Sequence, residues 1–417
     1  MSNNSQQDFS IAFYWGDRKT GSLALIARRG GKTTVKRLPN EAESSLPAAL
    51  KPILVGLTPE AQVVLLDPKT KAIRYSASFP CDAFAAHVYS EKNSDPLHSR
   101  DWYMNDGEKP HGNDTINCGD NGSSVTAMEN ANTTQAKYVG TVCVGRGHHQ
   151  AAFTAPSAQA PKVPRCTYIS NLNDGTISII GNDAADKASY MKLLGSINLC
   201  EADKEDGKVD AIPNNAFPHG LAYSPLTGKV YNLNNGYGTL LTIDPLTMKI
   251  EARIAIKGFS NAFMVPGGRY LIGRGADRKS EPQHAIGKMA VLDVTTMQIV
   301  AKLDLPDIYL SKYYFNLDAS KLYFTTGVSG SPEQQANLKS DVLLSFDLSQ
   351  LPTLPVPKEI KVGVVGTMDF AGAGKSQLAF ASDGAAGELV VIGGGNDEIV
   401  ERIKVGSGAS HSRVWAV

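Results

Sequence analysis

Short runs of β-branched, aromatic and other apolar residues alternate with turn residues along most of the chain. The clearest unit spans residues 219–254, where four strand-like segments are separated by Pro, Gly and Asn. Such segments, bounded by turn residues, are typical of short β-strands rather than of helices. Four consecutive strands are the make-up of one β-propeller blade, so the pattern predicts a blade here.

The same order of segments returns in six other stretches of the chain, with irregular spacing. These stretches are 53–79, 83–144, 149–197, 261–303, 313–361 and 367–405. A repeated unit of this size indicates a repeat architecture, because each unit needs its neighbours to cover its apolar faces. We therefore expect an all-β fold, a single β-propeller domain over residues 1–417, with a long polar insertion at about 91–136.

The two ends of the chain complete each other. Residues 411–417 contain one strand-like segment, whereas residues 11–38 contain three. Joining them into a shared blade closes the ring and removes an exposed sheet edge. This count predicts eight blades, although the weak pattern at 44–57 leaves seven blades open.

Three motifs carry a resemblance to a known family: Asn171-Leu-Asn-Asp-Gly-Thr, Val230-Tyr-Asn-Leu-Asn-Asn and Gly238-Thr-Leu-Leu-Thr-Ile-Asp-Pro. They resemble the repeats of the YVTN-type propellers, a group similar to the d1-haem propeller of dissimilatory nitrite reductases. The motifs are turns that precede strands, with Asn and Gly where the backbone dihedral φ must be unusual, so they specify fold rather than chemistry. The resemblance implies an exported bacterial protein and, among related rings, copper or haem enzymes that act on small nitrogen or sulfur compounds.

Charge and hydropathy exclude two classes of partner. Lys and Arg together number 41, and Asp and Glu also number 41, so no basic field is available for nucleic acid. No apolar stretch reaches the roughly 20 residues that a membrane-spanning helix needs. Residues 1–8 have neither a basic nor an apolar signal-peptide region. We expect a periplasmic protein if a signal peptide was removed, and a cytoplasmic one otherwise.

Five cysteines, an odd number, leave at least one thiol without a partner inside the chain. There is no Cys-x-x-Cys pattern, so neither a zinc ribbon nor covalent c-type haem attachment is indicated. In an exported protein, bridges such as Cys118 with Cys143 and Cys166 with Cys200 would form. Buried reduced cysteines are the alternative.

Histidines recur where the predicted inner strands begin. His149, His219 and His411 hold equivalent positions, each four residues before an aromatic residue, and His148 and His87 lie close to the same level. Imidazole is a common ligand of transition metals, and residues from several blades can converge on a propeller channel. The histidines therefore predict a metal site, with copper favoured and a noncovalent haem as the alternative. The competing structural interpretation is that such a histidine bonds a neighbouring carbonyl.

The adjacent pair His148 and His149 can face the channel together only where a turn or bulge interrupts the strand, because neighbours otherwise alternate.

Three further residues are candidate catalytic groups: His111 in the polar insertion, Arg146 near an inner strand, and Asp369, an inner-strand carboxylate. Arg146, together with Arg274, Arg413 and Lys312, could bind a small anion such as nitrite or sulfite, or a cofactor carboxylate. We expect a metal-dependent oxidoreductase acting on a small anionic nitrogen or sulfur compound, with an electron-transfer protein as a further candidate partner. The alternative is a nonenzymatic propeller that binds a partner or carries a haem-type cofactor.

Overall fold

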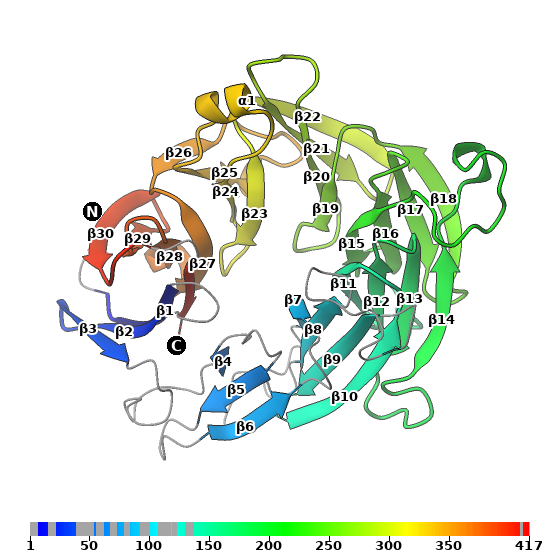
Figure 1. Ribbon diagram of the computed structural model, residues 1–417, viewed down its shortest axis with the longest axis horizontal. Coiled ribbons are helices and arrows are strands. Elements are labelled where there is room, and N and C mark those ends of the chain that lie inside the picture. The colour runs from blue at the N-terminus through cyan, green and yellow to red at the C-terminus, as the bar shows by residue number, and fades with distance from the viewer. Residues whose placement is uncertain are drawn as a thin grey trace.

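A computed structural model gives the arrangement of the strands. It describes residues 7–15, 22–38, 54–55, 62–66, 73–78, 84–91, 100–106, 118, 123–129, 137–408 and 412–416. Within these residues there are eight antiparallel sheets, seven with four strands and one with three. The sheets follow one another around a common centre in chain order, which is the arrangement of a β-propeller (Figure 1). The predicted fold class is confirmed.

Four sheets are complete in the central part of the chain, and each runs from its inner strand outward. The first of these is β11 (His148–Thr154), β12 (Cys166–Asn171), β13 (Thr176–Gly181) and β14 (Leu193–Asn198). The second is β15 (Pro218–Ser224), β16 (Lys229–Asn234), β17 (Thr239–Asp244) and β18 (Lys249–Ala255). The third is β19 (Asn261–Met264), β20 (Tyr270–Asp277), β21 (Ile286–Asp293) and β22 (Gln298–Pro306). The fourth is β23 (Leu310–Phe315), β24 (Lys321–Thr326), β25 (Val342–Asp347) and β26 (Lys358–Lys361), with the short helix α1 (Pro332–Asn337) between β24 and β25.

The remaining sheets lie on either side of these four. One is β27 (Val365–Ala371), β28 (Leu378–Asp383), β29 (Glu388–Gly393) and β30 (Glu398–Lys404). Another is β7 (Phe84–Glu91), β8 (Arg100–Asp106), β9 (Ser123–Glu129) and β10 (Lys137–Val144), so two of its strands fall inside the range expected for the polar insertion. The three-stranded sheet is β4 (Leu54–Val55), β5 (Gln62–Leu66) and β6 (Ile73–Ser78). The count of eight sheets rests on this small one, in the region where the sequence pattern is weakest.

The predicted ring closure is confirmed. The last strand, β31 (Ser412–Ala416), pairs antiparallel with β1 (Phe9–Trp15), and β2 (Ser22–Arg29) and β3 (Lys32–Leu38) complete the same sheet. Val414 of β31 lies opposite Phe13 of β1, and both side chains are buried. The end of the chain thus supplies the inner strand of a blade whose other strands come from its beginning.

Burial explains why the middle strands read as continuous apolar runs. Every residue of β12, β13 and β17 is buried, because neighbouring blades cover both faces of these strands. The outermost strand β18 has no fully buried residue. The turn between β12 and β13 has the predicted dihedral: Gly175 has a φ of 66°, and a Cβ there would lie 2.0 Å from Oδ1 of Asn214.

The cysteine predictions have a mixed outcome. Cys118 and Cys143 form a disulfide, as one of the expected bridges. The other expected bridge is wrong, because Cys166 and Cys200 are both free. Cys166 is held in the buried face of its blade, where burial raises the pKa of its thiol to about 11. Cys81 lies outside the described residues.

Candidate functional site

Four inner strands share an irregularity at the level of the predicted histidines. In β11, β15, β23 and β27 the pairing register slips at the same place, so that two residues of the inner strand oppose one residue of the second strand. These bulge pairs are His149–Gln150, His219–Gly220, Ser311–Lys312 and Gly366–Thr367. A bulge re-aims side chains and occurs often beside functional sites.

The bulges establish that His149 and His219 occupy equivalent backbone positions, as predicted. The bulge after His148 is also the interruption that would let two adjacent histidines face the same way. The directions of the His148 and His149 side chains lie outside the described part of the structure.

His219 is held by a backbone carbonyl of the next blade. Its Nδ1–H donates to the carbonyl oxygen of Ser260, which immediately precedes β19. Burial lowers the pKa of the imidazole, and the positive charge of Arg274 lowers it further. A neutral ring that donates from Nδ1 carries its lone pair on Nε2, which is the form in which histidine binds a metal. The carbonyl contact expected as the competing interpretation is therefore present, and it also prepares the ring as a ligand.

Arg274 of β20 is the charged side chain that acts on His219. Its Nη1 donates to the carbonyl oxygen of Leu310 over 2.8 Å, at the start of the next inner strand. Its Nε is buried and has no hydrogen-bond partner in the described part of the chain. Burial lowers the pKa of the guanidinium, while the phenols of Tyr309 and Tyr313 act in the opposite direction.

Two tyrosines approach each other from separate parts of the ring. Tyr89 lies on β7 and Tyr313 on β23, and the phenol of Tyr313 adds to the rise in the pKa of Tyr89. Burial raises the pKa of both hydroxyls, that of Tyr313 to about 12. The imidazole of His87 lies beside Tyr89, with 6.3 Å between ring centroids.

Polar side chains of several blades form hydrogen bonds with backbone groups on the free edge of the next inner strand. Gln150 Oε1 accepts from the N–H of Leu221 over 2.7 Å, and Lys312 Nζ donates to the carbonyl of Gly366 over 2.6 Å. An inner strand has no neighbour on its channel side, so its backbone groups need partners of this kind. His219 and Arg274 make the same type of contact.

Two residues predicted to be catalytic also have structural partners. Asp369 Oδ2 accepts from the N–H of Ala416 in β31 over 2.7 Å. The Nε of Arg146 donates to Asp174 Oδ1 over 2.8 Å, and its backbone N–H donates to Oδ2 of the same carboxylate. A ligand would therefore have to compete with these contacts before either residue could bind it.

Other predicted site residues lie outside the described residues: His111, His411 and the side chain of Arg413. Among the described residues, no group of three or more His, Cys, Asp or Glu side chains is placed to hold a metal ion. The predicted histidine set is thus represented in the described part by His219 and His87. Tyr89, Tyr313 and Ser260 belong to the same region. They were not predicted from the sequence, because nothing in their local sequence distinguishes them from other strand and turn residues.

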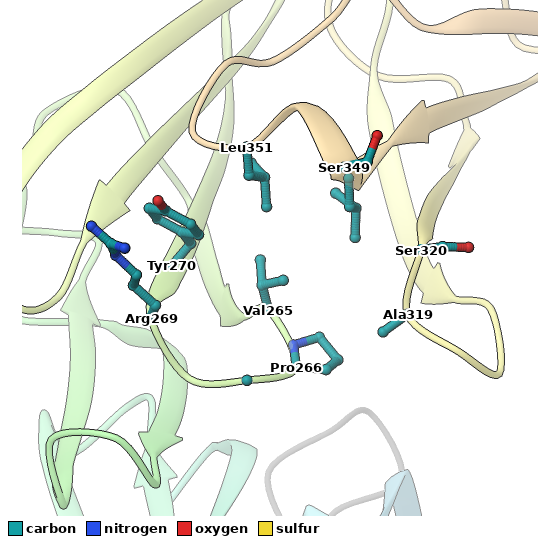
Figure 2. Close-up of a pocket in the computed structure, with 10 residues that line it drawn as sticks. Val265, Pro266, Arg269, Tyr270, Ala319, Ser320, Ser349 and Leu351 are labelled. Atoms are coloured by element: carbon teal, nitrogen blue, oxygen red, sulfur yellow. The ribbon is translucent and has the colours of Figure 1, made fainter.

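A hollow away from the channel is lined by a different set of side chains. It has a volume of about 380 Å³ and lies between the β19–β20 turn and the segments after β23 and β25. Figure 2 shows Arg269 and Tyr270 on one side, Ser320 and Ser349 on the other, and the apolar side chain of Val265 between them. Arg269 is already paired with Asp293 at 3.0 Å. The residues that line this hollow include no His, Cys, Asp or Glu, so it offers neither a usual metal ligand nor a general base for the two serines.

None of the helices in the described part of the chain is long and apolar enough to span a membrane.

No protein-family profile and no curated protein match this chain. Solved structures that are similar to it include dihydro-heme d1 dehydrogenase NirN in complex with DHE, with 16% identity, 89% of this chain and 67% of that chain covered, and a TM-score of 0.56. A protein from Lactobacillus plantarum has 10% identity, with 98% and 100% covered and a TM-score of 0.53. The periplasmic gluconolactonase PpgL of Pseudomonas aeruginosa has 10% identity, with 98% and 99% covered and a TM-score of 0.51. At these identities the likeness establishes the β-propeller fold, and it does not distinguish a YVTN-type propeller from others.

Proposed function

Starting from a β-propeller with a polar, histidine-bearing channel, we propose that this chain is an oxidoreductase that binds a transition-metal cofactor there. The observation that carries the proposal is the state of His219, neutral and fixed through Nδ1 to the Ser260 carbonyl. Metal-ligating histidines usually donate their second ring nitrogen in this way. A bound copper ion or haem iron would supply one-electron chemistry.

Copper is the metal favoured by the sequence. Its site would combine His219 with His149, at the equivalent bulge position, and with His148, His87 and His411 as further ligands. Imidazole ligands suit copper, and a rigid ring of blades would hold them in place. The equivalence of His149 and His219 in the backbone supports this set.

A noncovalent haem is the second candidate, and one observation favours it. It would need an imidazole ligand and cations for its carboxylates; His219 would supply the first, and Arg274 is a partly buried cation near it. NirN, which has a similar fold, is described in complex with DHE. If the bound cofactor proves inert, the protein is a carrier rather than an enzyme.

The substrate we propose is a small anion of nitrogen or sulfur, such as nitrite or sulfite. Tyr89 and Tyr313 would lie in the same region as this substrate, near His87 and Arg274. We retain His111, Arg146 and Asp369 as candidate catalytic residues. Arg146 and Asp369 can act only when a ligand displaces Asp174 or the Ala416 N–H from them.

We also propose that the protein works in the periplasm, with an electron-transfer protein as its partner. The disulfide between Cys118 and Cys143 supports an oxidising compartment, since cytosolic reductants keep such thiols reduced. The fold similarity to a periplasmic gluconolactonase agrees with this location.

The decisive experiment is elemental analysis and an absorption spectrum of the full chain purified from its native host. We expect near-stoichiometric copper or iron, with copper charge-transfer bands or a haem spectrum separating the two cofactors. His219→Ala should lose the metal. His284→Ala is the matched control and should keep it, because His284 is exposed and bonded to Asp307, which follows the outer strand β22. Absence of both metals after reconstitution would remove the proposal.

A further inference from the structure

Arg274 is a partly buried cation that lacks a counter-charge in the described part of the chain. Its Nη1 is bonded to the Leu310 carbonyl, but its Nε is buried without a hydrogen-bond partner among the described residues. The ionisable groups that act on it are the phenols of Tyr309 and Tyr313, and neither is a carboxylate. Because an arginine stays protonated in proteins, this site carries a positive charge at any physiological pH.

Two arginines of the described residues are fully buried, and both have a carboxylate partner. Arg28 forms an ion pair with Glu401, and Arg100 lies 3.4 Å from a carboxylate oxygen of Glu91. Burying a guanidinium is costly unless a carboxylate or other anion compensates its charge. Arg274 therefore differs from Arg28 and Arg100 because no described carboxylate compensates its charge.

Two of the other basic residues near the inner strands already have partners. Arg146 donates to Asp174 from both its backbone N–H and its Nε, and Lys312 donates to the Gly366 carbonyl. Arg274 also lies close enough to His219 for its charge to lower the pKa of that imidazole. Any ligand on Arg274 would thus lie beside the residue to which the metal is assigned.

We propose that Arg274 binds an oxygen atom of a small anion, a carboxylate or an inorganic oxyanion, beside His219 in the channel. The anion would accept a charge-assisted hydrogen bond from Nε and compensate the buried charge. This inference rests on the proposed function for the location of the site, but it requires no metal to be bound.

The test measures anion binding to the metal-free full chain by calorimetry and by thermal shift. Sodium nitrite and sodium acetate are the probes, with sodium chloride at the same ionic strength as the reference, since a ligand specific for the folded state raises its stability. Arg274→Gln should weaken binding at least about tenfold, the loss expected for one hydrogen bond to a charged group. The affinity of Arg274→Lys should lie between those of the wild type and Arg274→Gln, because an ammonium keeps the charge but lacks the planar guanidinium.

Arg269→Gln is the matched control. Arg269 immediately precedes the same strand, but it is exposed and paired with Asp293, so its loss should leave anion binding unchanged. Binding of nitrite alone identifies an oxyanion site, and binding of acetate as well identifies a carboxylate site for a cofactor. Arg274→Lys also serves if the Gln variant does not fold.

Two results would overturn the inference: neither anion binds to the wild-type chain, or a folded Arg274→Gln variant binds both within twofold of wild type. These outcomes leave the metal proposal untouched, because metal content is measured separately. Conversely, loss of metal binding in the wild-type protein would not alter an anion titration performed without metal.

Discussion

Replacing Asp369 by Ala should loosen the closure of the ring. The carboxylate accepts from the N–H of Ala416 over 2.7 Å and from the N–H of Phe370 over 2.8 Å, and it is half-buried. A hydrogen bond to a charged group contributes about 1.5–3 kcal/mol, and partial exposure places each bond at the low end of that range. We therefore expect Asp369→Ala to lower the free energy of unfolding by about 2–4 kcal/mol. Asp369→Asn keeps one acceptor oxygen and should lose roughly half of this.

The assay is urea unfolding combined with hydrogen exchange of the C-terminal peptide. Trp415 lies in β31, so tryptophan fluorescence includes a reporter on the strand that Asp369 holds. In the Ala variant the amides of residues 412–416 should exchange faster than in wild type. Asp304→Ala is the control, because Asp304 is exposed and paired with Lys288 on an outer strand, and it should change stability by less than about 1 kcal/mol. Unchanged midpoints and unchanged exchange in Asp369→Ala would refute the structural role.

Three further predictions concern the channel and the disulfide. In metal-free protein, the free energy of unfolding should fall as the pH drops below about 6.5. The histidine of the unfolded chain binds a proton there, whereas folded His219, with its lowered pKa, stays neutral to a lower pH. The pH dependence of the urea midpoint should therefore be flatter in His219→Asn. Gly220→Ala should destabilise by roughly 2 kcal/mol or more, since φ is 136° and a Cβ would lie 2.5 Å from a backbone nitrogen, whereas Gly258→Ala, with open space around it, should cost only about 1 kcal/mol in thermal unfolding. Reduction of Cys118–Cys143, or its replacement by a pair of serines, should lower stability by about 2–4 kcal/mol, and an equal melting temperature with and without reductant would contradict this.

The fold was largely predictable because its determinants are local and repeated. Most blades can be recognised from the same order of short strands separated by turn residues. Gly175 has the positive φ that its motif predicts. The shared blade followed from counting strands at the two ends, and β31 pairs with β1 accordingly. The sequence pattern was weakest at 44–57, and there the structure contains the smallest sheet, with the two-residue strand β4.

The candidate site was predictable in part. Position along a repeat identified His219, and the equivalence of His149 with it follows from the bulges. The role of Asp369 was not accessible in this way, because its partner, Ala416, is supplied by the far end of the ring. The free pair Cys166 and Cys200 illustrates the same point, since spacing alone does not determine which thiols meet.

By itself the sequence determined the all-β class, the repeating blade and the way the termini close the ring, because strand period and turn chemistry act over a few residues at a time. The tertiary structure decided which polar groups of the inner strands form hydrogen bonds that join neighbouring blades. Residues such as Lys312 and Asp369 satisfy the free edge of the next inner strand, and that edge exists only once the blades surround a channel. The same packing buries the Nε of Arg274 near His219 and leaves it unpartnered among the described residues. An uncompensated charge is a property of three-dimensional surroundings, and no spacing along the chain reveals it.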